Sequence, residues 1–298
     1  MPSKQLKKST AMNTQDKGGR KMALTSQEIT YLKEQAKQIR LDIINTTQKA
    51  GGAHIGGGLS MTEILTILYY KYLNIKPEDP SWEDRDRVVL SKGHGGIGYA
   101  PVLANKGYFD KELLNEFNHF KSPFGMHLDG NKVKGVDVST GSLGHGLPMA
   151  VGLALGARLQ GKSWHTYCIL GDGECNEGSI WEAAMAAAHY KVTNLITFVD
   201  RNKLMIDGCT EDIMCLEPFA DKWTSFGFKV IEIDGHSFEE LSSAIDAAKL
   251  EFNAPVLILA NTVKGKGVDF MEGEVKWHYG SIDSDMATKA RESVMAMD

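Results

Sequence analysis

Short apolar runs alternate along the chain with longer stretches in which apolar residues recur at helical spacing. The runs predict strands over 87–90, 165–170, 194–200, 228–235 and 255–262. The intervening stretches predict helices, the clearest over 179–190, 217–227 and 237–252. Strands that alternate with helices form parallel sheets, because each crossover returns the chain to the same edge. The pattern therefore predicts an α/β fold with three layers, α/β/α, around a central, mainly parallel sheet.

The part of the chain before the first strand is predicted to be helical. Thr25 and Ser26 form a cap-like start, after which apolar residues recur at helical spacing up to Ile43. The glycine-rich run GGAHIGGG is expected to break this helix at 51–58, and a buried helix is expected to start at Ser60. We expect one domain over residues 24–298 with a loop-rich C-terminal end.

Composition excludes several classes of protein. With 33 Lys and Arg against 38 Asp and Glu, the net charge of −5 argues against a dedicated nucleic-acid binder. No apolar run approaches the length of a membrane span. The four cysteines lack CxxC spacing, which favours reduced thiols in a cytoplasmic protein. Residues 1–23 are basic and polar with little to bury, so we predict a flexible N-terminal arm.

A glycine turn lined with acidic residues, GDGECNEG at 171–178, follows the second predicted strand. A carboxylate would repel a phosphate there unless a divalent cation lay between them, and Mg²⁺ commonly shares its oxygen ligands between protein and phosphate. Asp172 could supply one ligand and Asn202, after the neighbouring strand, a second. Gly173 would let its amide approach the phosphate. A tight turn with Asp172 as a helix cap is the alternative for the motif taken alone.

Histidines form a second group of candidates. Those in glycine-rich or polar loops could bind phosphate and hydroxyl groups or carry protons: they are His54, His94, His127 and His278. Four others lack this context and are expected to be structural: His119, His165, His189 and His236. His145 precedes an Ala- and Gly-rich helix, where either a flat ligand ring or close helix packing would explain the glycines.

Rival motifs are weak. The chain has no Walker A lysine, no GxSxG elbow and no GxGxxG placed after a strand. Lys264 and Lys266, in VKGKG after the last predicted strand, are expected in a solvated or anion-facing loop.

Taken together, the motifs GGAHIGGG, SKGHG, HLDGNKVKGVDVSTGSLGHG, GDGECNEG, DRNKLMIDG and WHYG resemble, in order, the N-terminal half of the transketolase family. The resemblance covers nearly the whole chain from about residue 24. It implies the thiamine-diphosphate-binding fold, with thiamine diphosphate and Mg²⁺ as cofactors; Ca²⁺ or Mn²⁺ could replace Mg²⁺.

The resemblance also implies roles for individual residues. The metal ligands would be Asp172, Asn202 and the carbonyl of Leu204. The cofactor would lie against His94, Gly141, Leu143, Gly144, Gly173, Asn202 and His278. The catalytic set would be His54, His94, His127, His278 and Glu177, with His54 and His127 on the donor substrate and Glu177 in a carboxylate relay at a subunit interface.

The length implies a divided enzyme, because transketolases carry a pyrimidine-binding module and a C-terminal domain after this half. We expect the N-terminal subunit of a two-chain transketolase, which transfers a two-carbon ketol group from a ketose to an aldose. A C-terminal subunit would supply the pyrimidine-binding module with its catalytic glutamate, in a heterotetramer of two chain types. The alternatives are a subunit of a deoxyxylulose-phosphate synthase-like or 2-oxo-acid dehydrogenase alpha-like enzyme, or a non-catalytic paralogue.

Overall fold

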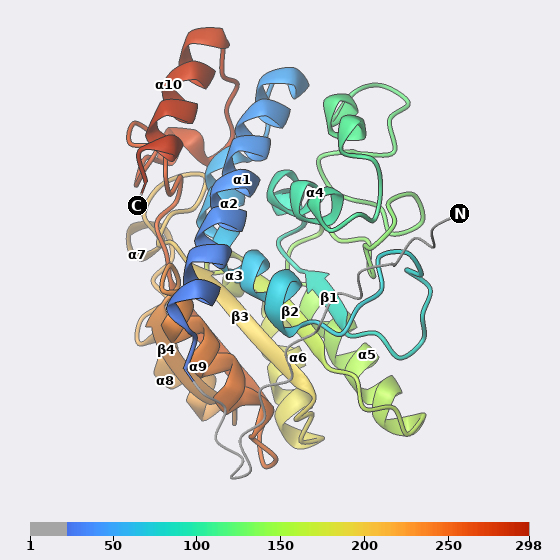
Figure 1. Cartoon of the computed structure of the whole chain (residues 1–298). Helices are drawn as coiled ribbons and strands as arrows, with labels where there is room; N and C mark the ends of the chain where they lie inside the picture. Colours follow the sequence, from blue (N-terminus) through green and yellow to red (C-terminus); the bar gives the residue numbers. More distant parts are fainter. Residues whose placement is uncertain (1–22, 298) are drawn as a thin grey trace, which may run out of the picture.

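Five parallel strands form the centre of the computed structural model, which describes residues 23–297 (Figure 1). They are β1 (Arg87–Leu90), β2 (Thr166–Gly171), β3 (Leu195–Arg201), β4 (Lys229–Asp234) and β5 (Val256–Asn261). The strand order is β1-β2-β3-β5-β4, and every neighbouring pair runs parallel. All five predicted strands are therefore confirmed.

Helices cover both faces of this sheet (Figure 1). The α-helices are α1 (Ser26–Ala50), α2 (Ile55–Ser60), α3 (Thr62–Ile67), α4 (Gly96–Asn105), α5 (Gly146–Leu159), α6 (Gly178–His189), α7 (Thr210–Ile213), α8 (Phe219–Ser225), α9 (Phe238–Lys249) and α10 (Ser284–Met295). Short 3₁₀ or π turns are η1 (Leu68–Tyr72), η2 (Gly93–Gly95), η3 (Lys111–Glu116), η4 (Gly173–Asn176) and η5 (Val275–His278). Helices α1 to α4, α9 and α10 share one apolar core with the sheet, while α5, α6 and α8 share another.

Side chains of one strand divide between these two cores. In β2, Tyr167 and Ile169 belong to the core under α1 to α4, whereas Cys168 and Leu170 belong to the core under α5 and α6. All six residues of β2 are buried. This is the pattern of a parallel sheet covered on both faces, and it confirms the predicted three layers.

Helix α1 begins where the sequence predicts. The side chain of Thr25 accepts a hydrogen bond from the amide of Glu28, and the Glu28 carboxylate accepts one from the amide of Thr25. This capping box satisfies backbone donors that the first helical turn leaves free. Gly51, with φ of 72°, ends the helix in the left-handed conformation.

The glycine-rich run differs from the prediction. Helix α2 already begins at Ile55 and passes through three buried glycines to Ser60, so the expectation of a break lasting to residue 58 is wrong. Glycines are poor helix formers, but here the absence of side chains permits close packing. A Cβ on Gly56 would lie 2.6 Å from the carbonyl oxygen of Trp277, and one on Gly58 would lie 2.9 Å from Ile97 Cγ2. Tertiary contact therefore outweighs local propensity.

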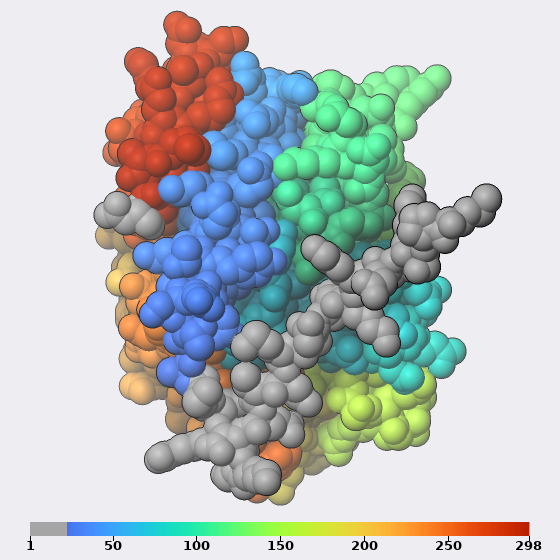
Figure 2. Space-filling model, in the orientation of Figure 1, coloured from blue at the N-terminus to red at the C-terminus, as the bar shows by residue number. Residues whose placement is uncertain are grey.

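The C-terminal end is also more regular than expected. Helix α10 packs beside α1 (Figures 1 and 2). The Asp283 side chain caps it by accepting a hydrogen bond from the amide of Met286, and Ala287, Ala290 and Val294 are buried at helical spacing. The expectation of a loop-rich end did not take account of this short apolar stripe.

Two further expectations concern the chain as a whole. Apart from Ala23, the predicted N-terminal arm lies outside the described residues. Within residues 23–297, no helix is both long and apolar enough to cross a membrane.

The close crossing of α2 and α4 generates a prediction about stability. A Cβ on Gly98 would lie 2.9 Å from the carbonyl oxygen of Gly58 and 2.9 Å from Met61 Cε, so Gly98→Ala should lower the free energy of unfolding by about 1–3 kcal/mol through overpacking. Gly152 in α5 has nothing within 4 Å of the same added atom. Gly152→Ala should therefore raise the free energy of unfolding by about 0.5–1 kcal/mol. Urea denaturation of the two variants measures both values, and a lower stability of Gly152→Ala than of Gly98→Ala would contradict the packing.

Candidate functional site

The carboxyl ends of β2 and β3 lie side by side, since Gly171 pairs in register with Asp200. A cavity of about 340 Å³ opens at this edge of the sheet. Ten of the predicted site residues line it: His54, His94, His127, Gly141, Leu143, Asp172, Gly173, Asn202, Leu204 and His278. Loops that are far apart in the sequence therefore meet at one place, as expected for ligand sites in open parallel sheets.

Two predicted residues lie next to the cavity without lining it. Gly144 adopts a φ of 84°, and an added Cβ would lie 2.6 Å from the Cβ of Glu177. Glu177 itself is exposed at the start of α6. The structure thus places Glu177 beside the loop 141–144, and its role in a relay stays a prediction.

The acidic turn holds Asp172 in a defined orientation. Its Oδ1 accepts a hydrogen bond of 2.7 Å from the amide of Gly173, and its Oδ2 accepts one of 2.6 Å from the amide of Lys203. The side chain is 3% exposed, and burial followed by the charge of Asp200 raises the pKa of Asp172. A buried carboxylate held beside a second carboxylate is stabilised by a cation.

Asn202 and Leu204 occupy the same edge on the β3 side. The Asn202 side chain donates to Asp200 Oδ2 at 3.2 Å, which leaves its carbonyl oxygen as the acceptor for the Leu204 amide, also at 3.2 Å. The carbonyl oxygen of Leu204 accepts from the ammonium of Lys264 at 2.7 Å. One carboxylate, one amide oxygen and one backbone carbonyl are the oxygen donors that Mg²⁺ favours.

The three candidate metal ligands do not form a cluster of acidic, histidine or cysteine side chains. Among the described residues, no group of three or more His, Cys, Asp or Glu side chains is placed to hold a metal. The candidate metal ligands include only one side chain of these types, so the two observations agree.

Three histidine rings form a compact group at the cavity. The ring of His54 lies 4.9 Å from that of His94 and 5.3 Å from that of His278, and the last two stack at 5.6 Å. Burial is the main cause that lowers each pKa, to about 4 for His54, about 2 for His94 and about 3 for His278. Nearby lysine ammoniums lower all three further. The three rings are therefore neutral at physiological pH.

Lys264 assigns the proton on His278. Its ammonium lies 2.9 Å from Nδ1 of His278, and because an ammonium can only donate, Nδ1 accepts and Nε2 carries the proton. Burial and the charge of Lys92 lower the pKa of Lys264 to about 8. Lys264 is 2% exposed, so it does not lie in a solvated loop, whereas the anion-facing alternative fits its position in the cavity wall.

Lys92 also lines the cavity, although no role was predicted for it from the sequence. Its ammonium pairs with the carboxylate of Asp200 and donates to the carbonyl oxygen of Gly57 at 3.0 Å. Asp200 additionally accepts from Ser60 and Thr262. The position of Lys92 in SKGHG, directly after β1, was a usable signal because the strand-end rule applies to it equally.

Glu174 was likewise singled out only as an acidic residue of the turn. It is buried, and its carboxylate accepts from Ser91 Oγ at 2.5 Å, from the amide of Gly144 at 3.0 Å and from the amide of Gly171 at 3.1 Å. It therefore ties three loops of the cavity wall together. Burial raises its pKa, against these hydrogen bonds.

The histidine expected to be structural at position 236 is satisfied within the fold. Its Nε2 accepts from the amide of Val263 at 2.9 Å, so Nδ1 carries the proton and faces Glu63 Oε2 at 2.9 Å. His145 occupies the N-cap position of α5, but its exposed ring makes no capping hydrogen bond and does not line the cavity.

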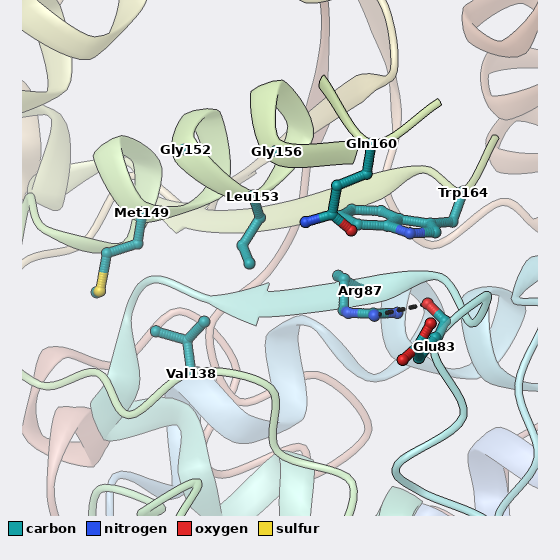
Figure 3. Close-up of a pocket in the computed structure, with 9 residues that line it drawn as sticks. All are labelled: Glu83, Arg87, Val138, Met149, Gly152, Leu153, Gly156, Gln160 and Trp164. Atoms are coloured by element: carbon teal, nitrogen blue, oxygen red, sulfur yellow. Dashed lines mark hydrogen bonds between the residues drawn. The ribbon is translucent and has the colours of Figure 1, made fainter. Parts of the chain in front are cut away.

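A second, more open hollow of about 640 Å³ runs between α5 and β1 (Figure 3). Met149 and Leu153 line one side, and Arg87 lies on the other, where it donates to the carbonyl oxygen of Glu83 at 2.9 Å and covers the Trp164 ring. This hollow is larger, but it lacks the convergent titratable groups of the histidine cavity, which is therefore the candidate active site.

Comparison with known proteins identifies the class to which this site belongs. Residues 32–297 match the family described as transketolase, thiamine diphosphate binding domain. The chain is 44% identical over 261 residues to the 6-deoxy-6-sulfo-D-fructose transketolase subunit SqwG of Clostridium sp. (strain MSTE9), covering 88% of this chain and 95% of that one. It is 40% identical to one of the subunits of the apulose-4-phosphate transketolase of Phocaeicola vulgatus, covering 85% of this chain and 90% of that one.

Solved transketolases share the fold over the same region. The transketolase of Campylobacter jejuni superposes with a TM-score of 0.85 at 33% identity, covering 89% of this chain and 43% of that one. The chain belongs to the transketolase family and corresponds to its thiamine-diphosphate-binding domain. The predicted family and fold are confirmed, and the chain spans less than half the length of the solved transketolases but nearly all of the subunit relatives.

The residues present fit thiamine diphosphate. Gly171 and Gly173 expose bare backbone to the cavity, and a Cβ on Gly173 would lie 2.9 Å from Met205 Cγ. Nδ1 of His54 is buried and has no hydrogen-bond partner in the described part of the chain. The ammonium of Lys264 donates to two neutral acceptors, the carbonyl oxygen of Leu204 and Nδ1 of His278. A polar, anionic ligand would satisfy these groups.

The depressed histidine pKa values generate a prediction about pH. His54, His94 and His278 should remain neutral down to about pH 5, while the same rings in the urea-unfolded chain should titrate near 6.5. Because the unfolded state then binds protons that the folded state refuses, stability should fall as pH drops below about 6.5. NMR titration of the folded chain with ¹³C-labelled histidine, assigned with His→Gln variants, measures the three pKa values. Rings that titrate near 6.5 in the folded chain would contradict the buried cluster.

Proposed function

We propose that this protein is the N-terminal subunit of a two-chain transketolase, which binds thiamine diphosphate and Mg²⁺ and transfers a two-carbon ketol group from a ketose to an aldose. One observation carries the proposal: Asp172, Asn202 and Leu204 line the same cavity as the histidine cluster. Its relatives are named as transketolase subunits, and the family is described as binding thiamine diphosphate.

The metal would be held by the Asp172 carboxylate, the Asn202 side-chain oxygen and the Leu204 carbonyl. Mg²⁺ suits these hard oxygen donors, and Ca²⁺ or Mn²⁺ could replace it. The dication would compensate Asp172 and Asp200 and, at the same time, attract a diphosphate. This accounts for an acidic turn at a phosphate site.

The diphosphate would be bound by groups that already face the cavity. The neutral rings of His94 and His278 and the ammonium of Lys264 can donate to it. The amide of Gly173 donates to Asp172 Oδ1 in this structure and would join them only by exchanging that partner for the diphosphate. The loop with Gly141, Leu143 and Gly144 would lie along the cofactor rings. Bound thiamine diphosphate supplies the nucleophile and the electron sink for cleaving a carbon–carbon bond beside a ketose carbonyl.

The remaining polar groups would act on the substrate. His54 is neutral, and its Nδ1 has no hydrogen-bond partner within residues 23–297, so it can accept or donate a proton at a donor hydroxyl. His127 lines the same cavity and would bind a neighbouring hydroxyl. Because Nε2 of His278 carries its proton, that ring can donate but not accept there.

A second polypeptide would complete this site. The chain covers 41% of the human transketolase, and subunit-named relatives of its own length exist. We infer a C-terminal subunit that supplies the pyrimidine-binding module and its catalytic glutamate, with Glu177 in a carboxylate relay at the interface. We propose that the two chain types form a heterotetramer and that the enzyme is cytoplasmic.

An anionic ketose is the donor that the relatives favour. One is named for a sulfo-D-fructose and another for a phosphorylated sugar, apulose 4-phosphate. The relatives' names also favour transketolase over deoxyxylulose-phosphate synthase-like or 2-oxo-acid dehydrogenase alpha-like enzymes. Retention of the predicted metal ligands and all four loop histidines argues against a non-catalytic paralogue.

The two-chain arrangement predicts activity that depends on complementation. The purified chain should show no ketol transfer with thiamine diphosphate, Mg²⁺, a ketose phosphate and an aldose phosphate. Adding a C-terminal transketolase subunit from the same organism should produce transfer, followed by chromatographic analysis of the product sugars. Transfer by the chain alone would refute the need for a partner.

The proposed metal site predicts a selective loss of affinity. Asp172→Ala should weaken thiamine diphosphate binding at least about 100-fold in the two-chain enzyme, because the metal loses its charged ligand. Asp212→Ala, which removes an exposed carboxylate nearby, is the matched control and should bind normally. Calorimetric titration with thiamine diphosphate at fixed Mg²⁺ measures both. Equal affinities, with both variants folded, would remove Asp172 from the metal site.

A further inference from the structure

Arg201, the last residue of β3, is a buried cation that the proposed chemistry does not use. It is 2% exposed, and its guanidinium lies against the face of Phe219. One side of it faces Asp172, where Nη1 lies 3.4 Å from Oδ2. The other side faces the segment that follows β3. A guanidinium presents five N–H donors in a rigid planar fork, so it fixes the geometry between partners on its different edges, whereas an ammonium is a point charge with rotatable donors.

The segment in question comprises residues 203–217. Leu204, Met205 and Ile206 of this segment line the cavity, and its carboxyl half returns to Arg201. Nη1 donates to Thr210 Oγ1 at 3.0 Å, while Nη2 donates to Glu211 Oε1 at 3.0 Å and to Glu217 Oε1 at 2.8 Å. Arg201 thus fastens the carboxyl half of the segment to the sheet.

Glu211 extends this connection into the backbone. Its carboxylate accepts from the amides of Leu216 and Glu217, at 3.3 and 3.2 Å. The hydrogen bonds of these amides therefore depend on a carboxylate whose partner is Arg201. At the other end, the amide of Lys203 donates to the same Asp172 oxygen that Arg201 faces.

We propose that Arg201 is a positioning residue that couples the 203–217 segment to the metal-binding carboxylate of Asp172. Two donors on Oδ2 fix the rotation of the Asp172 carboxylate, and the same guanidinium fixes the segment that carries the carbonyl of Leu204 and the side chains of Met205 and Ile206. The order of the 203–217 segment and the orientation of the Asp172 carboxylate therefore depend on each other. This inference rests on the proposed metal site, but its first test does not.

The first test uses the full chain without cofactor and follows hydrogen exchange at Leu216 and Glu217. Arg201→Met should accelerate exchange of these amides about tenfold or more, and Asp172→Asn should accelerate it as well, because coupling between two sites is reciprocal. Arg201→Lys keeps the charge but loses the planar set of guanidinium donors, so its amide exchange rates should be intermediate. Arg158→Met, which removes an exposed arginine from α5, is the matched control and should leave the rates unchanged. Unchanged rates in both Arg201→Met and Asp172→Asn would overturn the proposal.

The second test measures the Mg²⁺ requirement of the two-chain enzyme. In Arg201→Met, the Mg²⁺ concentration for half-maximal thiamine diphosphate binding should rise about 10- to 100-fold, and excess Mg²⁺ should restore full binding. A purely structural defect would lower the amount bound without rescue by Mg²⁺, and that outcome would overturn the positioning role. If Arg201→Met is unfolded by circular dichroism, Arg201→Lys and Glu217→Gln replace it, with a smaller rise in the Mg²⁺ requirement that excess Mg²⁺ again overcomes.

The two proposals fail separately. Wild-type chain that binds no thiamine diphosphate with partner and Mg²⁺ would refute the proposed function, and the exchange rates would still decide the coupling. Normal binding by the wild type, with an unchanged Mg²⁺ requirement in Arg201→Met, would refute the role of Arg201 alone.

Discussion

The rest of the site depends on one constraint, the burial of two carboxylates, Asp172 and Asp200, at the ends of neighbouring strands. Their proximity follows directly from the parallel register of β2 and β3. Burying like charges together is unfavourable without compensation, and the structure supplies it on three sides. Lys92 pairs with Asp200, Arg201 faces Asp172, and backbone amides of the acidic turn and of Lys203 donate to the Asp172 oxygens. One open direction remains, toward the cavity.

Burial at the same edge of the sheet raises the pKa of Asp172 but lowers the pKa values of His54, His94 and His278. Lys92 and Lys264 stand next to three desolvated rings, and both effects oppose protonation. The cavity wall therefore combines fixed cations with neutral imidazoles, so that hydrogen-bond donors are available without further positive charge. Lys264 places an ammonium in the cavity wall where an anion would be held, and the neutral rings that can carry protons lie beside it.

Much of this was predictable from sequence, for a specific reason. Strand periodicity places the strand ends, and in parallel sheets residues that follow strand ends share one edge, so Asp172 and Asn202 could be placed together from the sequence alone. The parts that could not be predicted depend on contacts between distant segments. Helix α2 forms across three glycines because Trp277 and α4 occupy the space that side chains would take, and no local propensity reports this. The burial of Lys264 and the hydrogen bonds that Glu174 accepts from three loops likewise depend on segments that meet only in the folded chain.

Close packing around α2 also limits how this site can vary. A Cβ on Gly56 would lie 2.6 Å from the carbonyl oxygen of Trp277, and one on Gly58 would lie 2.9 Å from Ile97 Cγ2 in α4, so these two positions beside His54 have no room for a side chain. Substitutions that retune the choice of sugar would therefore have to arise elsewhere on the cavity wall. Ile206, 61% exposed at the cavity, is a position where a change of size or polarity meets no such obstacle. Packing thus confines positions 56 and 58 to glycine, whereas the exposed position 206 of the cavity wall can accept other side chains.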